Sequence, residues 1–314
     1  MNQFRRNALI FTVVVLVAVF LNKDFLLPHL DSSSSEIPPP LQPALIQSTS
    51  IQNLALLGEG GPPPQPILVG DLGVPDLNVE AALVKNMTTG AILFEFKADR
   101  PWPLASLTKL MTAVVAKEKL GLETDVVITE EAVQIEGAAG NFTAGEKFAV
   151  YDLIEALLVA SSNDAAYALA HAYGYDTFLA EMNNLAATLQ MQETTFVDPA
   201  GLSVLNQSTA YDVQKLTRYI LETHPDLFAI TKEKKTNLYE EVSRKSRSVA
   251  AINRFAGRKD FLGGKTGYID EARQNLVSVF SHKSQKLLIV VFGTEDRFLE
   301  TEKLLSWIQT TFVF

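Results

Sequence analysis

The chain has 314 residues, a formal net charge of -9 at pH 7 and no cysteine, and its sequence pI is near 5.1. Its 47% apolar and 20% charged residues are typical of globular proteins with one large domain or two ordinary ones. The acidic balance does not indicate a nucleic-acid partner. Without cysteine, disulfides, thiolate chemistry and cysteine-based zinc sites are excluded.

We predict that residues 1–30 direct the chain to a membrane. Arg5 and Arg6 precede an uninterrupted apolar run, Ala8–Leu21, which has the size and charge order of a signal sequence. Because no small-x-small cleavage motif follows, we expect an uncleaved anchor. The run is short for a full span, so a signal sequence removed before Ser32 is the alternative. In both cases the N-terminal positive charges place the remaining chain outside the cytoplasm.

The segment 31–78 is rich in serine, proline and glycine, as in "SSSSEIPPPLQP" and "GEGGPPPQP". It shows little hydrophobic periodicity, and this composition is typical of a linker. We therefore expect one folded domain over residues 79–314.

The predicted domain has strands near both ends, a block of helices between them and one helix at its C-terminal end. Two strand-like runs flank a turn at 86–90, which predicts a hairpin. A basic stretch, 232–258, is expected to be irregular, and strands return after it, followed by a last helix over 300–310. The other predicted helices cover 104–116, 151–160, 164–174, 175–189 and 209–223. This order predicts an α/β (α+β) fold, in which an antiparallel sheet completed by both ends of the domain is flanked by helices and carries an inserted all-helical subdomain.

One lysine stands out in the first predicted helix. The segment "LASLTKLMTAVVA" is apolar nearly all round, which is typical of a buried helix, yet it contains Lys109. A buried ammonium is costly unless it is paired or loses its proton. Ser106 lies three residues earlier, on the same helix face. The pair is either a nucleophile with its base or a snorkelling lysine beside a capping serine.

Two further motifs decide between these interpretations. Ser161-Ser162-Asn163 falls at a break between two predicted helices, and Lys265-Thr266-Gly267 falls on a strand with glycines on both sides. Each motif alone is weak, because similar triplets occur by chance in many chains. Together with Ser106 and Lys109, they form the ordered trio found in penicillin-binding proteins and class A β-lactamases.

The sequence therefore resembles the D-alanyl-D-alanine carboxypeptidases of the low-molecular-weight penicillin-binding protein family, within the serine β-lactamase-like superfamily. The resemblance covers nearly all of 79–312, including "LASLTKLMTA", "FVDPAGLS", "STAYDVQKLTRYI" and "GGKTGYIDEA". It implies the fold of that family. Two positions depart from the family pattern: Ser162 and Arg273 both stand where glycine is more usual, which puts fine substrate preference in doubt.

The residues indicate acyl transfer in their own right. With no cysteine and four scattered histidines (His29, His171, His224 and His282), Ser106 needs another base, and neutral Lys109 supplies it. Ser161 would pass a proton to the departing amine, while the charge of Lys265 would help to keep Lys109 neutral. No cofactor and no metal are expected.

The resemblance implies further roles. Asn163 would hydrogen-bond the peptide side of the substrate, and Thr266 would bind its terminal carboxylate. Gly267 and its neighbouring glycines would let the strand lie close to the ligand. The backbone N–H groups of Ser106 and Tyr268 would form the oxyanion hole.

The expected reaction is removal of the terminal D-alanine from peptidoglycan stem peptides, with β-lactams as covalent inhibitors. A D,D-endopeptidase would use the same residues. A β-lactamase would need a deacylating glutamate, and the pair Glu233 and Asn237 only loosely fits one. The alternative that is not an enzyme is an inactive wall-binding or β-lactam-sensing domain.

Overall fold

The computed structural model describes residues 65–69, 73–137 and 139–314, all within one compact unit. The predicted anchor, 1–30, and most of the predicted linker lie outside the described residues. Within the described ranges, no helix is both long enough and apolar enough to cross a membrane. The described part of the linker includes a short strand, β1 (Ile67–Leu68), which pairs with β13 (Phe312–Val313) at the end of the domain.

The centre of the domain is a five-stranded antiparallel sheet with the order β10-β11-β12-β2-β3. The hairpin predicted around 86–90 is present, and its first strand lies beside β12, so both ends of the domain complete one sheet as expected. The strands are β2 (Ala81–Asn86), β3 (Ile92–Phe96), β10 (Phe261–Ile269), β11 (Arg273–His282) and β12 (Gln285–Thr294).

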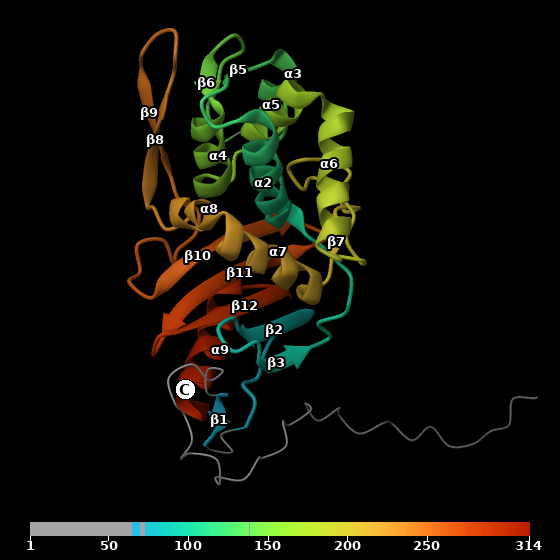
Figure 1. Cartoon of the computed structure of the whole chain (residues 1–314), viewed down its shortest axis with the longest axis vertical. Coiled ribbons are helices and arrows are strands. Elements are labelled where there is room, and N and C mark those ends of the chain that lie inside the picture. The colour runs from blue at the N-terminus through green and yellow to red at the C-terminus, as the bar shows by residue number, and fades with distance from the viewer. Residues whose placement is uncertain (1–64, 70–72, 138) are drawn as a thin grey trace, which may run out of the picture. The chain divides into compact units, whose positions relative to one another are not determined.

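Strand β12 is buried on both faces because it is apolar at nearly every position. Leu288, Val290 and Phe292 belong to the core beneath the helical block. The alternate residues, exemplified by Ile289 and Val291, belong to the core under α9 (Arg297–Thr311), because successive side chains of a strand point to opposite faces. The sheet therefore lies between two helical layers (Figure 1).

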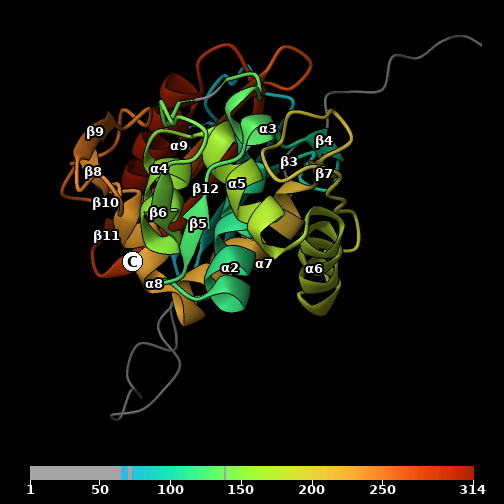
Figure 2. The ribbon, with the colours of Figure 1, turned by 90° about the horizontal axis from the view of Figure 1, so that it is seen from above.

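The helical subdomain is inserted between β3 and β10, as predicted, and lies on one side of the sheet in Figure 1. Helix α5 contacts α2, α3, α4 and α6, and it lies near the middle of the block when seen from above (Figure 2). The elements between β3 and β10 include η2 (Ala105–Thr108), α2 (Lys109–Leu120), α3 (Glu130–Val133), α4 (Val150–Val159), α5 (Asn163–Tyr173), α6 (Tyr175–Thr188), α7 (Ala210–Thr223) and α8 (Pro225–Ile230).

Two expectations about the secondary structure were wrong. The stretch 232–258 is not irregular throughout, because β8 (Lys235–Tyr239) and β9 (Ser246–Ala250) form a hairpin within it. Each strand buries one residue fully, which leaves a weak apolar signal in the sequence. The last helix begins at Arg297 rather than at residue 300, because the Asp296 side chain caps it by accepting from the backbone N–H groups of the next turn.

Short paired strands complete the described part of the domain. They are β4 (Trp102–Pro103) with β7 (Gln207–Ser208), and β5 (Asp125–Val127) with β6 (Lys147–Ala149). The first pair holds the chain that leads into η2 against the chain that leads into α7, so it places two segments near the site side by side.

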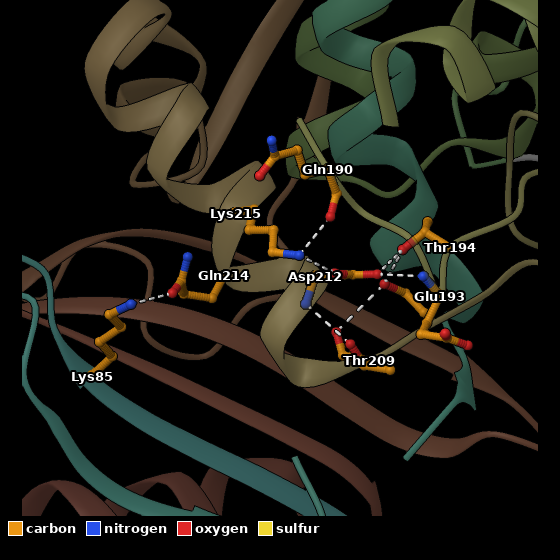
Figure 3. A network of polar contacts seen from close by, with 9 residues as sticks. Lys85, Gln190, Glu193, Thr194, Thr209, Asp212, Gln214 and Lys215 are labelled. Carbon is orange, nitrogen blue, oxygen red and sulfur yellow. Dashed lines mark hydrogen bonds and ion pairs between the residues drawn. The ribbon is translucent and has the colours of Figure 1, made fainter. Parts of the chain in front are cut away.

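A polar network fixes the N-terminus of α7 (Figure 3). Thr209 caps the helix, and its hydroxyl accepts the Asp212 N–H at 3.1 Å. The Asp212 carboxylate accepts the Glu193 N–H at 2.9 Å and the Thr194 hydroxyl at 3.0 Å, and it pairs with Lys215 at 2.7 Å. The segment that follows α6 is therefore tied to α7 shortly before it reaches the site.

Candidate active site

Ser106 lies in a tight turn that precedes a buried helix. Ala105, immediately before it, is fully buried and adopts a left-handed conformation with φ 50°. This conformation is costly for a residue with a side chain and is found chiefly where the surrounding structure imposes it. A Cβ on Gly201 would lie 1.9 Å from the Ala105 carbonyl oxygen, so the neighbouring loop packs directly on the turn. The turn presents Ser106, which is only half-buried, at the start of α2.

Lys109 joins Ser106 to two other elements. Its side chain is fully buried, and Nζ lies 2.8 Å from Ser106 Oγ, 2.7 Å from Asn163 Oδ1 and 2.7 Å from the Ala200 carbonyl oxygen. A neutral amine has two N–H groups and one lone pair. Asn163 Oδ1 and the carbonyl oxygen only accept hydrogen bonds, so they take the two N–H groups, and the lone pair is directed to the Ser106 hydroxyl. The snorkelling interpretation of Lys109 is wrong, because the amine is enclosed.

The environment of Lys109 favours the loss of its proton. Burial lowers its pKa from 10.5 to about 7, against the opposing influence of Asp198 and Asp164. The charge of Lys265 was expected to keep Lys109 neutral. In the structure the main cause is burial, and the pKa of Lys265 is itself lowered by burial, then by the charges of Lys109 and Arg297. It is therefore unfavourable for Lys109 and Lys265 to be charged at the same time.

Lys265 and Ser161 form a second polar pair. Lys265 is almost fully buried on β10, and its Nζ lies 2.8 Å from Ser161 Oγ and 2.9 Å from the Thr266 carbonyl oxygen. Ser161 has φ 60°, a strained backbone that turns the chain between α4 and α5. When Lys265 is charged it can only donate, so the Ser161 oxygen accepts from it and the Ser161 proton is available to another acceptor.

Asn163 begins α5 and connects Lys109 to a loop. Its Oδ1 accepts from Lys109, and its Nδ2 donates to the Glu136 carbonyl oxygen at 2.6 Å. Ser162, where glycine is more usual, caps α5: its hydroxyl accepts the Ala165 N–H at 3.1 Å and donates to Asp164. The serine at this position therefore stabilises the start of the helix that carries Asn163.

Sequence reasoning missed the loop that supplies the third partner of Lys109. The buried Asp198 carboxylate accepts the N–H groups of Ala200 at 2.8 Å, Gly201 at 2.6 Å and Ser203 at 2.8 Å. These bonds hold the Ala200 carbonyl toward Lys109. The segment "FVDPAGLS" contributed to the resemblance, but a backbone acceptor cannot be assigned from side-chain types.

At Gly267, strand β10 lies against the turn that presents Ser106, which we call the nucleophile turn. A Cβ at this position would come within 2.7 Å of the Leu104 carbonyl oxygen, so only glycine permits this approach. Two residues that were not predicted support the contact. Asn275 on β11 donates to the Leu104 carbonyl oxygen at 3.2 Å, and Arg297 donates to the Gly267 carbonyl oxygen at 2.8 Å.

The other two predicted residues of β10 differ in exposure. Thr266 is buried, whereas Tyr268 is 57% exposed at the rim and its hydroxyl donates to Asp270 at 2.7 Å. The structure thus brings Ser106, Lys109 and Asn163 together directly, places Lys265 against Ser161, and sets β10 beside the nucleophile turn. The roles predicted for Thr266 and Tyr268 stay predictions.

The alternative catalytic groups lie elsewhere. Glu233 is exposed in the turn before β8, and Asn237 is exposed on that strand, so the pair does not form a deacylating site. His224 pairs with Glu118 at 2.8 Å, and His282 packs on Phe314. Across the described residues, no three His, Cys, Asp or Glu side chains gather in a group that could hold a metal ion.

The chain is similar in sequence to known proteins. The chain is 30% identical to the D-alanyl-D-alanine carboxypeptidase DacC of Escherichia coli, over 74% of this chain and 62% of that protein. It is also 30% identical to a D-alanyl-D-alanine endopeptidase of Pseudomonas aeruginosa, over 82% of this chain and 85% of that protein. The chain therefore spans less than two thirds of the first relative and most of the second.

A solved structure shows the same architecture. The chain is similar, with a TM-score of 0.66 and 28% identity, to penicillin-binding protein D2 from Listeria monocytogenes in its cefotaxime-bound form, over 76% of this chain and 100% of that one. The predicted fold class is confirmed. Residues 71–296 match the family model described as D-alanyl-D-alanine carboxypeptidase, a range that includes η2, α5 and β10. The chain belongs to the D-alanyl-D-alanine carboxypeptidase family.

Proposed function

We propose that the protein is a serine-type D-alanyl-D-alanine carboxypeptidase acting on peptidoglycan stem peptides. The observation that carries the proposal is the enclosed amine of Lys109, which lies 2.8 Å from the half-buried Ser106 hydroxyl. A domain that only binds the wall has no need of a buried base beside a presented hydroxyl. The family and the named carboxypeptidase relative support the same activity.

The reaction follows from the positions of the two lysines. Neutral Lys109 takes the proton of Ser106, whose oxygen attacks the carbonyl carbon of the penultimate D-alanine and forms a tetrahedral intermediate. As the C–N bond breaks, Ser161 donates its proton to the departing amine of the terminal D-alanine, and the proton that Lys109 took from Ser106 returns to Ser161, which leaves Lys109 neutral again. Water then hydrolyses the Ser106 ester, which releases the shortened peptide and restores the hydroxyl.

The remaining predicted residues bind the substrate in this proposal. Thr266 and Lys265 take the terminal carboxylate, and Asn163 takes the peptide side. The backbone N–H groups of Ser106 and Tyr268 stabilise the oxyanion, a contribution typically worth about 3 to 4 kcal/mol for a single donor. β-Lactams would acylate Ser106 through the same groups, as expected from the cefotaxime-bound relative.

D,D-Endopeptidase activity on cross-links is a second candidate with its own support. The endopeptidase relative matches this chain over 85% of its length, whereas the carboxypeptidase relative matches over 62%. The chemistry is the same acyl transfer, and the two activities differ only in whether the leaving amine belongs to free D-alanine or to a second stem peptide.

We also propose that the domain acts outside the cytoplasm and is tethered to the membrane by 1–30. The basic and apolar pattern of that segment and the location of the expected substrate support this. Fractionation of the full chain with membranes, with Met1 at its N-terminus, is the expected result. A mature N-terminus after Leu27 would instead indicate a cleaved signal sequence.

Labelling with penicillin, followed by digestion of defined muropeptides, tests the enzymatic proposal. Mass spectrometry should find a long-lived penicilloyl adduct on Ser106, absent from Ser106→Ala, and release of D-alanine from pentapeptides. Cleavage of cross-linked dimers without D-alanine release would favour the endopeptidase, and rapid penicillin turnover would favour a β-lactamase. An adduct without any cleavage would leave the β-lactam-sensing domain, and neither adduct nor cleavage would leave the wall-binding domain.

A further inference from the structure

Arg247 of the β8–β9 hairpin binds the segment 139–146, which lies between α3 and β6. The Arg247 guanidinium donates to the Asn141 carbonyl oxygen and pairs with the Glu146 carboxylate, and it lies 3.5 Å from the Gly140 carbonyl oxygen. Glu146 in turn accepts the Thr143 N–H at 2.9 Å. One planar side chain therefore contacts both ends of the segment.

Two aromatic rings hold the same guanidinium. The centroids of Phe142 and Phe148 lie 5.5 Å and 5.2 Å from the Arg247 carbon that joins its nitrogens, and the rings themselves are 4.9 Å apart. Such stacking is a property of the flat guanidinium that an ammonium does not reproduce. A groove of about 360 Å³ lies beside the contact, lined by Lys245, Ser246 and other residues of both segments. Glu240 and Glu241 join the hairpin to Lys147 on β6, and Arg247 is the side chain that carries the contact on to residues 140–142.

The far side of the same segment reaches the site. The Gly140 N–H donates to both oxygens of the buried Asp164, at 3.2 and 3.1 Å. Asp164 is next to Asn163, which binds Lys109. Asp164 also receives the hydroxyl of Ser162. The contacts therefore run from the hairpin through the 139–146 segment to the start of α5 and its catalytic neighbours.

We infer that Arg247 is a positioning residue of the active site, which fixes the 139–146 segment so that Asp164 and Asn163 keep the geometry that Lys109 needs. The expected effect on the acylation rate rests on the proposed function. The expected effect on the 139–146 segment itself does not. Small displacements of catalytic groups can cost up to about a hundredfold in rate. The hairpin, remote in sequence from all three motifs, would then determine how well the base works.

Arg247→Met tests the inference, with Arg244→Met as the matched control. Methionine keeps an apolar stem between Phe142 and Phe148 but loses the reach to Glu146 and the carbonyl oxygens. Arg244 belongs to the same hairpin, its side chain is 68% exposed, and it pairs with Glu241 at 3.0 Å. The rate of Ser106 acylation by penicillin should fall by about tenfold to a hundredfold in Arg247→Met and stay at the parent value in Arg244→Met.

Amide hydrogen exchange supplies a readout that does not need activity. Peptides covering 139–146 should exchange faster in Arg247→Met, while peptides from α2 stay protected as in the parent. Arg247→Lys should be intermediate in both measurements, because it keeps a charge opposite Glu146 without the planar fork, and it replaces Arg247→Met if that variant does not fold.

Unchanged exchange would show that Arg247 does not hold the segment. Faster exchange with parent-like acylation would show that the segment does not position the site. Equal losses in Arg244→Met would assign the effect to the hairpin as a whole, against the inference. If the parent itself is not acylated, the proposed function fails. The exchange comparison would still decide whether Arg247 holds the 139–146 segment.

Discussion

Lys109 Nζ lies 2.7 Å from the carbonyl oxygen of Ala200, a residue 91 positions later in the chain. This contact completes the set of acceptors around the amine, and it explains how a lysine can be fully buried without a carboxylate touching it. Asp198 does not contact the amine: it fixes the Ala200 loop, and its charge raises the pKa of Lys109. Burial lowers the pKa of Lys109 to about 7, and because the acceptors in contact with the amine are neutral, no carboxylate holds the proton on it.

Lys109→Met should separate catalysis from folding. Methionine fits the apolar surroundings, but it leaves Asn163 Oδ1 and the Ala200 carbonyl oxygen without their donor, so the free energy of unfolding should fall by about 1–3 kcal/mol. Acylation of Ser106 should fall by at least about a hundredfold. Lys117→Met on the same helix, which breaks a surface pair with Asp226, should retain the parent rate. Normal acylation by folded Lys109→Met would make Lys109 a structural residue.

The acylation rate should rise with pH through about 7. Only the neutral amine of Lys109 accepts the Ser106 proton, and its pKa is lowered to about 7, so the acidic limb of kcat/KM for the free enzyme should have its midpoint there. The free energy of unfolding should also rise with pH in this range. Between pH 7 and 10.5 Lys109 is neutral in the folded state but protonated in the unfolded state, so the unfolded state binds one more proton and raising the pH favours folding. A rate that is constant from pH 5 to 9 would contradict the assignment.

Asp198→Asn should move that acidic limb to lower pH. The Asp198 charge raises the pKa of Lys109, and the amide removes the charge while one oxygen can still accept the Ala200 and Gly201 N–H groups. The comparison is a pH profile of penicillin acylation for the parent and the variant at equal ionic strength. A limb that stays in place would mean that the field of Asp198 does not reach the amine.

Gly267→Ala should slow acylation without unfolding the sheet. The new Cβ would meet the Leu104 carbonyl oxygen at 2.7 Å and Ala105 at 3.3 Å, so the turn that presents Ser106 must shift. We expect a loss of about tenfold to a hundredfold in the acylation rate, measured by intact-protein mass spectrometry over time. Near-parent rates would show that β10 can move away from the turn at little cost.

The sequence predicted those parts of the site that depend on short spacing or on side-chain type. Ser106 and Lys109 are three residues apart, so their short spacing brings them together across the junction of η2 and α2. The strands of the central sheet follow from their apolar runs. The Ala200 carbonyl oxygen was missed because it is a backbone group placed by a buried carboxylate. The β8–β9 hairpin was missed because Leu238 and Val249 are the only residues of its strands that are fully buried.

Arg273 offers a test of why glycine is usual at its position. Its φ of 53° is unfavourable for any residue with a Cβ by roughly 1 kcal/mol. Its ion pairs, 3.8 Å to Glu80 and 3.7 Å to Glu295, belong to a side chain that is 45% exposed and contribute little. Arg273→Gly should therefore unfold in urea within about 1 kcal/mol of the parent, while Arg273→Ala, which keeps the strain and loses the pairs, should be about 1 kcal/mol less stable than the glycine variant. Equal stability of the two variants would show that the backbone relaxes at this turn. A loss well above 1 kcal/mol in both variants would show that the arginine contacts stabilise the fold after all.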